Sequence, residues 1–188
     1  GVEIDPLVVE LGEQWLPLSE SAQAAVKVVA GADARSLLRS APHDLDLILL
    51  DAYARQFEIP AHLATEEFFA EAYAHLRPGG VFVVNLGTTS AVDSDLGFVA
   101  KIRAGLAASF GDSQRMHRVP RSRNWVLFAR KDMDFPALQD LGALLPSGLP
   151  LAVGAACLPG QTVEGIGELS HVVPFTDDRN PLQLQQTM

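Results

Sequence analysis

Apolar and polar positions along the first 40 residues alternate between strand-like and helix-like patterns. GVEID at residues 1–5 is a short apolar and acidic run, and PLVVELGEQWL after it places its apolar residues on one face of a helix. AVKVVAGAD at residues 25–33 combines β-branched and small residues, and ARSLLRS continues as a short helix. The pattern therefore predicts two strands, each followed by a helix.

The centre of the chain repeats this order with a stronger signal. Residues 44–53, DLDLILLDAY, form a nearly continuous apolar run with polar ends, which is typical of a strand buried on both faces of a parallel sheet. After a loop, Thr65 is expected to be the N-cap of the helix TEEFFAEAYAHL, with acidic residues in its first turn and His75 on its surface. RPGG is expected to close this helix and start the strand VFVVNLG at residues 81–87.

The last part of the chain carries weaker patterns. A helix is expected from about Asp95 to Phe110, followed by the strands QRMHRVP and NWVLFARK in an antiparallel hairpin at the sheet edge. Residues 132–188 read as a poorly defined extension, although FPALQDLGALL could be a helix. The order of elements predicts an α/β fold in one domain spanning residues 1–188, with a doubly wound, mostly parallel, Rossmann-like sheet.

Composition narrows the class of protein. Of the 188 residues 48% are apolar and 20% charged, which suits a globular chain, and no uncharged apolar run reaches the roughly 18 residues of a membrane span. The N-terminus lacks the order of a signal peptide, so a cytoplasmic location is expected. A formal charge of −9 without a Lys or Arg cluster argues against nucleic acid and fits a cationic small molecule. The single Cys157 and the spacing of the histidines predict neither a disulfide nor a metal site.

Polar residues follow the ends of successive predicted strands, where such sheets bind their ligands. Asp51 follows the apolar run LILL, where a carboxylate would be partly desolvated yet open to solvent, so it is the strongest candidate for a general base or an amine ligand. Glu3 could accept hydrogen bonds from a ribose diol and Asp33 from an adenine amine, and Asn85 ends a further strand. Plainer roles stay open: Asp51 could bond loop amides, Asp33 could cap ARSLLRS, and Glu3 could cap the first helix, although Asp5 suits that role better.

Five segments, taken in order, resemble the spermidine synthase family and its bacterial spermidine-synthase-like relatives. They are GVEIDPLVVELGEQWL, VVAGADARSLL, DLILLDAY, IPAHLATEEFFAEAYAHLRPGGVFVVNLG and the late TDDRNP. The likeness runs over residues 1 to about 130, with the last segment at 176–181. LRPGG before an apolar strand is shared with methyltransferases at large, so only IPAHLATEEFF and the ending favour the polyamine branch. The resemblance implies a sheet of the AdoMet-methyltransferase type.

This resemblance also implies an activity, a donor and an acceptor. The chain would be a transferase that moves an aminopropyl group from decarboxylated S-adenosylmethionine to a polyamine, without a metal. Glu3 would bind the ribose of the donor, Asp33 and Ala34 would lie at the adenine, and Asp51 would accept the proton of the attacking amine. Tyr53 could line the acceptor site, although a tyrosine at a strand end is as often a packing residue.

Two departures from the family pattern keep other functions open. Members of the family carry a second aspartate three positions after the first, where this chain has Ala54, and Glu58 could compensate from the loop. The family also places a strand and a glycine-rich turn before GVEID, between the strands that bear Glu3 and Asp51, so this chain is expected to be a fragment or to have that gap filled by another chain or a rearrangement. An AdoMet-dependent methyltransferase and a non-catalytic binding domain of the same fold remain alternatives. The oligomeric state also stays open, with a homodimer as one option.

Overall fold

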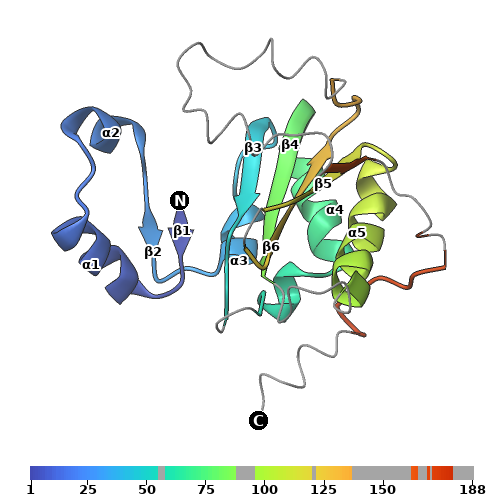
Figure 1. Cartoon of the computed structure of the whole chain (residues 1–188). Helices are drawn as coiled ribbons and strands as arrows, with labels where there is room; N and C mark the ends of the chain where they lie inside the picture. The colour runs from blue at the N-terminus through green and yellow to red at the C-terminus, as the bar shows by residue number, and fades with distance from the viewer. Residues whose placement is uncertain are drawn as a thin grey trace. The chain divides into compact units, whose positions relative to one another are not determined.

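The computed structural model describes residues 1–54, 58–87, 96–119, 122–136, 162–164, 169 and 171–179. The chain forms two compact units, an N-terminal unit of Gly1–Pro42 and a C-terminal unit of His43–Met188. Each unit has its own sheet (Figure 1), with two strands in the first and five among the described residues of the second. Among the helices of the described residues, none combines the length and the apolar character that crossing a membrane requires.

The N-terminal unit is built from two parallel strands and three short helices. Its elements in chain order are β1 (Val2–Glu3), α1 (Pro6–Trp15), α2 (Glu20–Ala25), β2 (Val29–Ala30) and α3 (Ala34–Leu38). A side-chain oxygen caps the start of each helix by accepting a backbone N–H bond, and the capping residues are Asp5, Ser19 and Asp33. The predicted strand and helix pairs are confirmed, as is the cap at Asp5.

The helix α2 is the element of this unit that the pattern did not reveal. The strand expected at residues 25–33 is shortened to Val29–Ala30, because α2 includes Ala25 and the paired strand β1 consists of Val2 and Glu3 alone. Ser19 followed by Glu20 is an N-cap signal with an acidic first turn, and it could have predicted this helix.

The C-terminal unit has a mixed sheet with the strand order β3-β4-β6-β5-β7. Its strands are β3 (Leu45–Leu50), β4 (Leu76–Gly87), β5 (Gln114–Arg118), β6 (Asn124–Arg130) and β7 (Thr162–Glu164). β3 and β4 are parallel, whereas β4–β6, β6–β5 and β5–β7 are antiparallel pairs. The predicted antiparallel hairpin of β5 and β6 is therefore confirmed, but its position at the sheet edge is wrong, because the short β7 pairs with β5 beyond it. β4 begins at Leu76 rather than at residue 81, so RPGG lies within the strand.

Two helices cover one face of this sheet and form its core with it. They are α4 (Glu66–His75), preceded by the 3-10 helix η1 (Ala61–Leu63), and α5 (Leu96–Phe110), and they lie side by side in Figure 1. The buried ring of Phe82 on β4 contacts Phe68 and Phe69 of α4 and Phe110 of α5. A Cβ on Gly105 would lie 3.1 Å from the Phe69 ring, so the glycine allows α5 to approach α4 closely.

The start of α4 joins two segments that are distant in sequence. Thr65 is its N-cap, as predicted, and accepts a bond from the Phe68 N–H, while its hydroxyl donates to Asp177 over 2.8 Å. The Asp177 N–H in turn donates to the Glu67 carboxylate, and the Glu66 N–H donates to the Phe175 carbonyl. The described part of TDDRNP thus contacts IPAHLATEEFF, and these are the two segments that favour the polyamine branch.

Two expectations about burial are wrong. β3 is not buried on both faces: Leu47 and Leu49 are 54% and 63% exposed, because β3 ends the sheet and α4 and α5 cover only the face on which Leu50 is buried. His75 is not on the surface, because the last turn of α4 runs directly into β4 and the His75 ring stacks on His43 at 4.0 Å. Cys157 and the helix expected within FPALQDLGALL beyond Pro136 lie outside the described residues.

Candidate functional site at the carboxyl ends of the strands

The N-terminal unit brings Glu3 and the loop leading to Asp33 to one edge of its sheet. β1 and β2 are parallel, so their carboxyl ends meet, and the Gly31 N–H donates to the Glu3 carbonyl over 2.8 Å. Gly31 has a φ of +71°, in the left-handed region that favours glycine, and a Cβ there would meet nothing within 4 Å. The backbone between these two acidic residues is therefore open.

Backbone groups already occupy one oxygen of each of these carboxylates. Oε1 of Glu3 accepts the Asp5 N–H at 2.9 Å, and Oδ1 of Asp33 accepts the Ser36 N–H at 2.8 Å. The capping alternative is thus confirmed for Asp33, and Ala34 is the first residue of the helix that it caps. Oε2 of Glu3 accepts no hydrogen bond from the residues that the structure describes, so it can receive a ligand hydroxyl.

The C-terminal unit gathers a carboxylate, a phenol and two amides where β3 and β4 end and β6 begins. Asp51 follows the last residue of β3, and its side chain is exposed. Nδ2 of Asn85 donates to Oδ1 of Asp51 over 2.9 Å, and Nδ2 of Asn124 donates to Oδ1 of Asn85 over 3.0 Å. The Tyr53 hydroxyl donates to the Asn85 backbone carbonyl over 3.0 Å. Asp51 is therefore the end of a chain of side-chain hydrogen bonds that crosses three strands.

Sequence reasoning recognised Asn85 only as a polar residue at a strand end and missed Asn124. Asn124 stands opposite Gly87 in the antiparallel register of β4 and β6, two positions from the pair of Asn85 with Val126. Since 39 residues separate the two asparagines, only this register brings their side chains together. The sequence signal was an asparagine at the first position of the predicted strand NWVLFARK.

Tyr53 lies close enough to Asp51 for the negative charge of Asp51 to affect the pKa of the phenol. Partial burial, and after it the negative charge of Asp51, raise the pKa of the Tyr53 phenol above its usual 10.0, while the backbone of Gly87 acts in the opposite direction. The protonated phenol donates its hydrogen bond to the Asn85 carbonyl, and the raised pKa extends this donor state to more alkaline pH.

Glu58 is next to the position where the family has its second aspartate. The Ala54 N–H donates to the Glu58 carbonyl over 2.8 Å, which closes the loop that follows Asp51. Ala54 is exposed and Glu58 is half-buried. The backbone of an acidic residue therefore lies beside Ala54.

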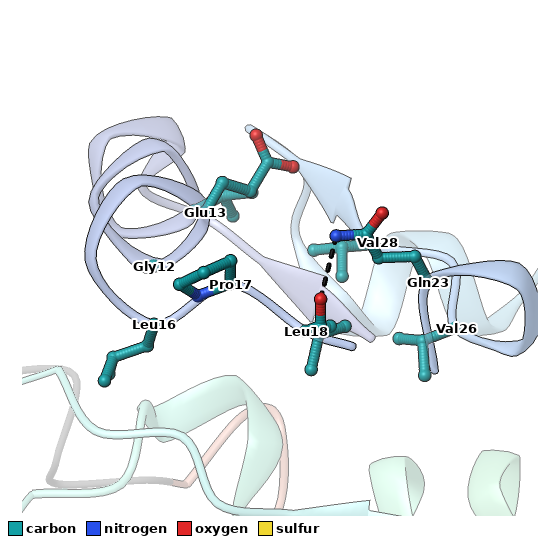
Figure 2. A pocket seen from close by; sticks show the side chains of 9 residues that line it. Gly12, Glu13, Leu16, Pro17, Leu18, Gln23, Val26 and Val28 are labelled. Carbon is teal, nitrogen blue, oxygen red and sulfur yellow. Dashed lines mark hydrogen bonds between the residues drawn. The ribbon is translucent and has the colours of Figure 1, made fainter. Parts of the chain in front are cut away.

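An open hollow in the N-terminal unit contains none of the predicted site residues. It measures about 630 Å³ and is shown in Figure 2; the residues that line it include Glu13, Leu16, Leu18, Gln23, Val26 and Val28. The Gln23 amide already donates to the Leu18 carbonyl across it, and Glu13 is its one charged lining residue. Elsewhere in the described part of the chain, no group of three His, Cys, Asp or Glu side chains could hold a metal ion.

The fold is Rossmann-like and of the AdoMet-methyltransferase type, as predicted. Within this class the chain is similar to spermidine-synthase-like proteins: over 132 residues, 70% of its length, it is 33% identical to a probable polyamine aminopropyl transferase of Bifidobacterium longum. It spans 28% of the length of that relative. No protein-family model matches the chain.

Solved structures confirm the predicted fold class. A probable spermidine synthase from Corynebacterium glutamicum superposes with a TM-score of 0.68 at 24% identity, covering 94% of this chain and 62% of that one. Human methyltransferase-like protein 13, in complex with SAH, gives a TM-score of 0.63 at 25% identity, covering 83% of this chain and 69% of that one. The resemblance to the spermidine synthase family is thus confirmed, and a methyltransferase shares the same fold.

Proposed function

We propose that this chain supplies donor-binding and acceptor-binding residues of a spermidine-synthase-like aminopropyltransferase. The reaction transfers an aminopropyl group from decarboxylated S-adenosylmethionine to a polyamine. One observation carries the proposal: Asp51, directly after the last residue of β3, has an exposed carboxylate whose Oδ1 accepts a hydrogen bond from Asn85. Its Oδ2 accepts no hydrogen bond from any described residue, which leaves this oxygen available to an amine.

An exposed carboxylate held in this way suits the chemistry of an amine acceptor. The nitrogen of the neutral amine forms a bond to the carbon beside the sulfonium, the bond from that carbon to sulfur breaks, and the sulfur leaves as a neutral thioether. The proton lost by the nitrogen passes to Asp51, while the leaving group needs no acid. The same negative charge attracts the cationic amine, and the net charge of −9 acts in the same direction.

The donor side of the proposal is supported by the N-terminal unit. Oε2 of Glu3 is available to a ribose hydroxyl, and the open backbone at Gly31 leads to Asp33 and Ala34, the residues assigned to the adenine. The capping bond of Asp33 uses its Oδ1 and fixes the carboxylate at the start of α3. The human methyltransferase-like protein in complex with SAH, which has the same fold, favours a donor of the AdoMet type.

An AdoMet-dependent methyltransferase is the second candidate, and Ala54 favours it. Without the second aspartate, Asp51 is left as one half of the acidic pair that holds a diamine in the family. The bond from the Ala54 N–H to the Glu58 carbonyl supports the aminopropyltransferase instead, because it brings the backbone of an acidic residue beside Ala54. The two functions differ in the donor that is consumed.

The test uses the intact protein with decarboxylated S-adenosylmethionine and putrescine or spermidine, in parallel with S-adenosylmethionine. Asp51→Asn is expected to abolish transfer while the affinity for methylthioadenosine changes by less than about tenfold, because the base is lost and the nucleoside contacts remain. Asp46→Asn is the matched control: Asp46 is on the same strand but pairs with Arg77, so turnover should be retained. Near-normal turnover of Asp51→Asn would exclude Asp51 as the base.

Calorimetry separates the remaining functions. Binding of methylthioadenosine that putrescine or spermidine strengthens supports the aminopropyltransferase. Tight binding of S-adenosylhomocysteine together with methyl transfer supports the second candidate. Failure to bind either nucleoside supports a non-catalytic domain of the same fold.

A further inference from the structure

We infer that Asn124 and Asn85 form an amide relay that orients Asp51, which makes both asparagines positioning residues for the transfer; this inference rests on the proposed function. The amide relay consists of Asn124 on β6, Asn85 on β4 and Asp51 at the end of β3. Its two hydrogen bonds measure 3.0 Å and 2.9 Å. Neither asparagine needs to touch the substrate for this role.

The direction of the relay follows from the chemistry of its members. A carboxylate can only accept hydrogen bonds, whereas an asparagine side chain has one donating end and one accepting end. Asn124 donates to Oδ1 of Asn85, so the Asn85 amide must present its Nδ2 group to Asp51. If Asn124 were absent, Asn85 could rotate by half a turn and place its carbonyl oxygen against the carboxylate, which repels it.

The backbone beneath the relay is held at several points. Asn85 and Asn124 belong to the β4–β6 ladder, in which Asn85 pairs with Val126 and Asn124 pairs with Gly87. The Tyr53 hydroxyl occupies the Asn85 carbonyl one position beyond the last β3–β4 pair, Leu50 with Val84. A site built on paired strands keeps its side chains in closer register than one built on loops.

Further bonds fix the first residue of β6. The Asn124 N–H donates to the Ser122 hydroxyl over 3.0 Å. The Asn124 carbonyl accepts a hydrogen bond from the Val119 N–H over 3.0 Å. Asn124 therefore starts β6 with both of its backbone groups bonded, and its side chain is left to hold Asn85.

The relay explains how the exposed carboxylate of Asp51 is held in one orientation toward the amine. With Oδ1 bonded to Asn85, the plane of the Asp51 carboxylate is restricted and Oδ2 becomes the oxygen that meets the amine. Small losses of alignment at a reacting group are costly, since a displacement of about 1 Å can lower a rate by roughly 100-fold. Orientation of Asp51 should therefore appear in kcat rather than in donor binding.

A double-mutant cycle of Asn85→Leu and Asn124→Ala tests the relay through the transfer rate. We expect Asn85→Leu to lower kcat by about 10- to 100-fold and Asn124→Ala by about fivefold, the effect of one hydrogen bond of about 1 kcal/mol, with KM for the nucleoside donor unchanged. The double variant should match Asn85→Leu alone, because Asn124 acts only through Asn85. Additive losses would overturn the relay. If Asn85→Leu does not fold, Asn85→Ala replaces it in the cycle.

Asn124→Asp separates orientation from packing. The aspartate has nearly the shape of asparagine, so a purely structural role predicts a milder effect than that of Asn124→Ala. The relay predicts the opposite order, because a carboxylate at position 124 cannot donate to Asn85 and would draw its Nδ2 group away from Asp51. A milder effect for Asn124→Asp contradicts the relay.

A measurement without turnover distinguishes failure of the relay from failure of the proposed function. The side-chain amide resonance of Asn85, assigned by its loss in Asn85→Leu, should shift in both Asn124→Ala and Asp51→Ala. If those shifts appear in a protein that transfers no aminopropyl group, the relay stands and the proposed function falls. If the protein is active and the resonance does not move, the relay falls and the proposed function stands.

Discussion

The two units of this chain both combine strands with helices but bury very different amounts of apolar surface. In the C-terminal unit Phe69 and Phe82 are fully buried between the helices and the sheet. In the N-terminal unit, which the structure describes throughout, α1 and α2 bury no residue, and Trp15 and Leu16 are 71% and 81% exposed. An amphipathic pattern therefore shows which face of a helix needs a partner, and it does not show that the partner is present.

Local interactions contribute a larger share of the stability of the N-terminal unit than of the C-terminal unit. Its helices begin at the side-chain caps Asp5, Ser19 and Asp33, and its sheet has two short strands. Each cap contributes about 1 kcal/mol, whereas burying one large apolar side chain contributes roughly 1.5–3 kcal/mol. We therefore expect the C-terminal unit to dominate the free energy of global unfolding and the N-terminal unit to open at lower cost.

The largest expected difference between the units comes from removing one aromatic ring from each. Phe69→Ala in α4 should lower the free energy of unfolding by about 3–5 kcal/mol, because it leaves a cavity in a closed core. Trp15→Ala, at the end of α1, should change it by less than about 0.5 kcal/mol, because that ring is exposed. Urea unfolding monitored by circular dichroism measures both. Equal losses in the two variants would contradict the comparison.

The same contrast explains what could be predicted from the sequence. Predictions that depend on a few neighbouring residues are confirmed. Asp5 and Thr65 are N-caps, and β3 ends directly before Asp51. Burial could not be predicted from the same segments. The run LILL does not reveal that Leu49 faces away from the helices, and the pattern around His75 does not reveal the ring of His43. Both depend on tertiary contacts rather than on local spacing.

The residues of the candidate site also fall into those that the sequence pattern predicts and those that depend on tertiary contacts. Glu3 ends β1 and Asp51 directly follows β3, as predicted, because the end of an apolar run is visible in the sequence. Asp33 instead lies beyond the end of β2 at Ala30, as the N-cap of α3. The hydrogen bond between Asn85 and Asn124 was not predictable, because it requires the antiparallel register of β4 with β6. Pattern alone therefore identifies the acidic residues and not the side chains that hold them.

A smaller contrast is expected from removing one helix cap in each unit. Thr65→Ala should lower the free energy of global unfolding by about 2 kcal/mol, because the fully buried hydroxyl both caps α4 and donates to Asp177. Asp5→Ala should leave global unfolding nearly unchanged and speed amide hydrogen exchange in α1, since this cap is exposed. Thr65→Ser keeps the hydroxyl and is the control, so it should recover most of the loss. If Asp5→Ala lowers global stability as much as Thr65→Ala, the N-terminal unit is not a separate, weaker unit.

The smallest expected effect is a change in tyrosine pKa. Its measurement tests whether the charge of Asp51 acts on the candidate site of the C-terminal unit. The chain has two tyrosines, Tyr53 and Tyr73, and the pKa of each is raised above 10.0. The main cause is burial for Tyr53, followed by the charge of Asp51, whereas for Tyr73 it is the hydrogen bond to Asp132. Asp51→Asn should therefore lower the pKa of Tyr53 alone, and Asp132→Asn should lower that of Tyr73 alone.

Titration of the two ¹³Cζ resonances measures these shifts, and the sign of the accompanying change in stability is fixed by linkage. Above pH 10 the unfolded chain loses phenol protons that the folded chain retains, so the contribution of each tyrosine is fully present below pH 10 and is lost as the pH rises through its raised pKa. Tyr53→Phe should remove the part of this alkaline loss that belongs to Tyr53. A Tyr53 resonance that titrates unchanged in Asp51→Asn would show that Asp51 does not act on the phenol, and the C-terminal unit would then not organise this end of its sheet through the charge of Asp51.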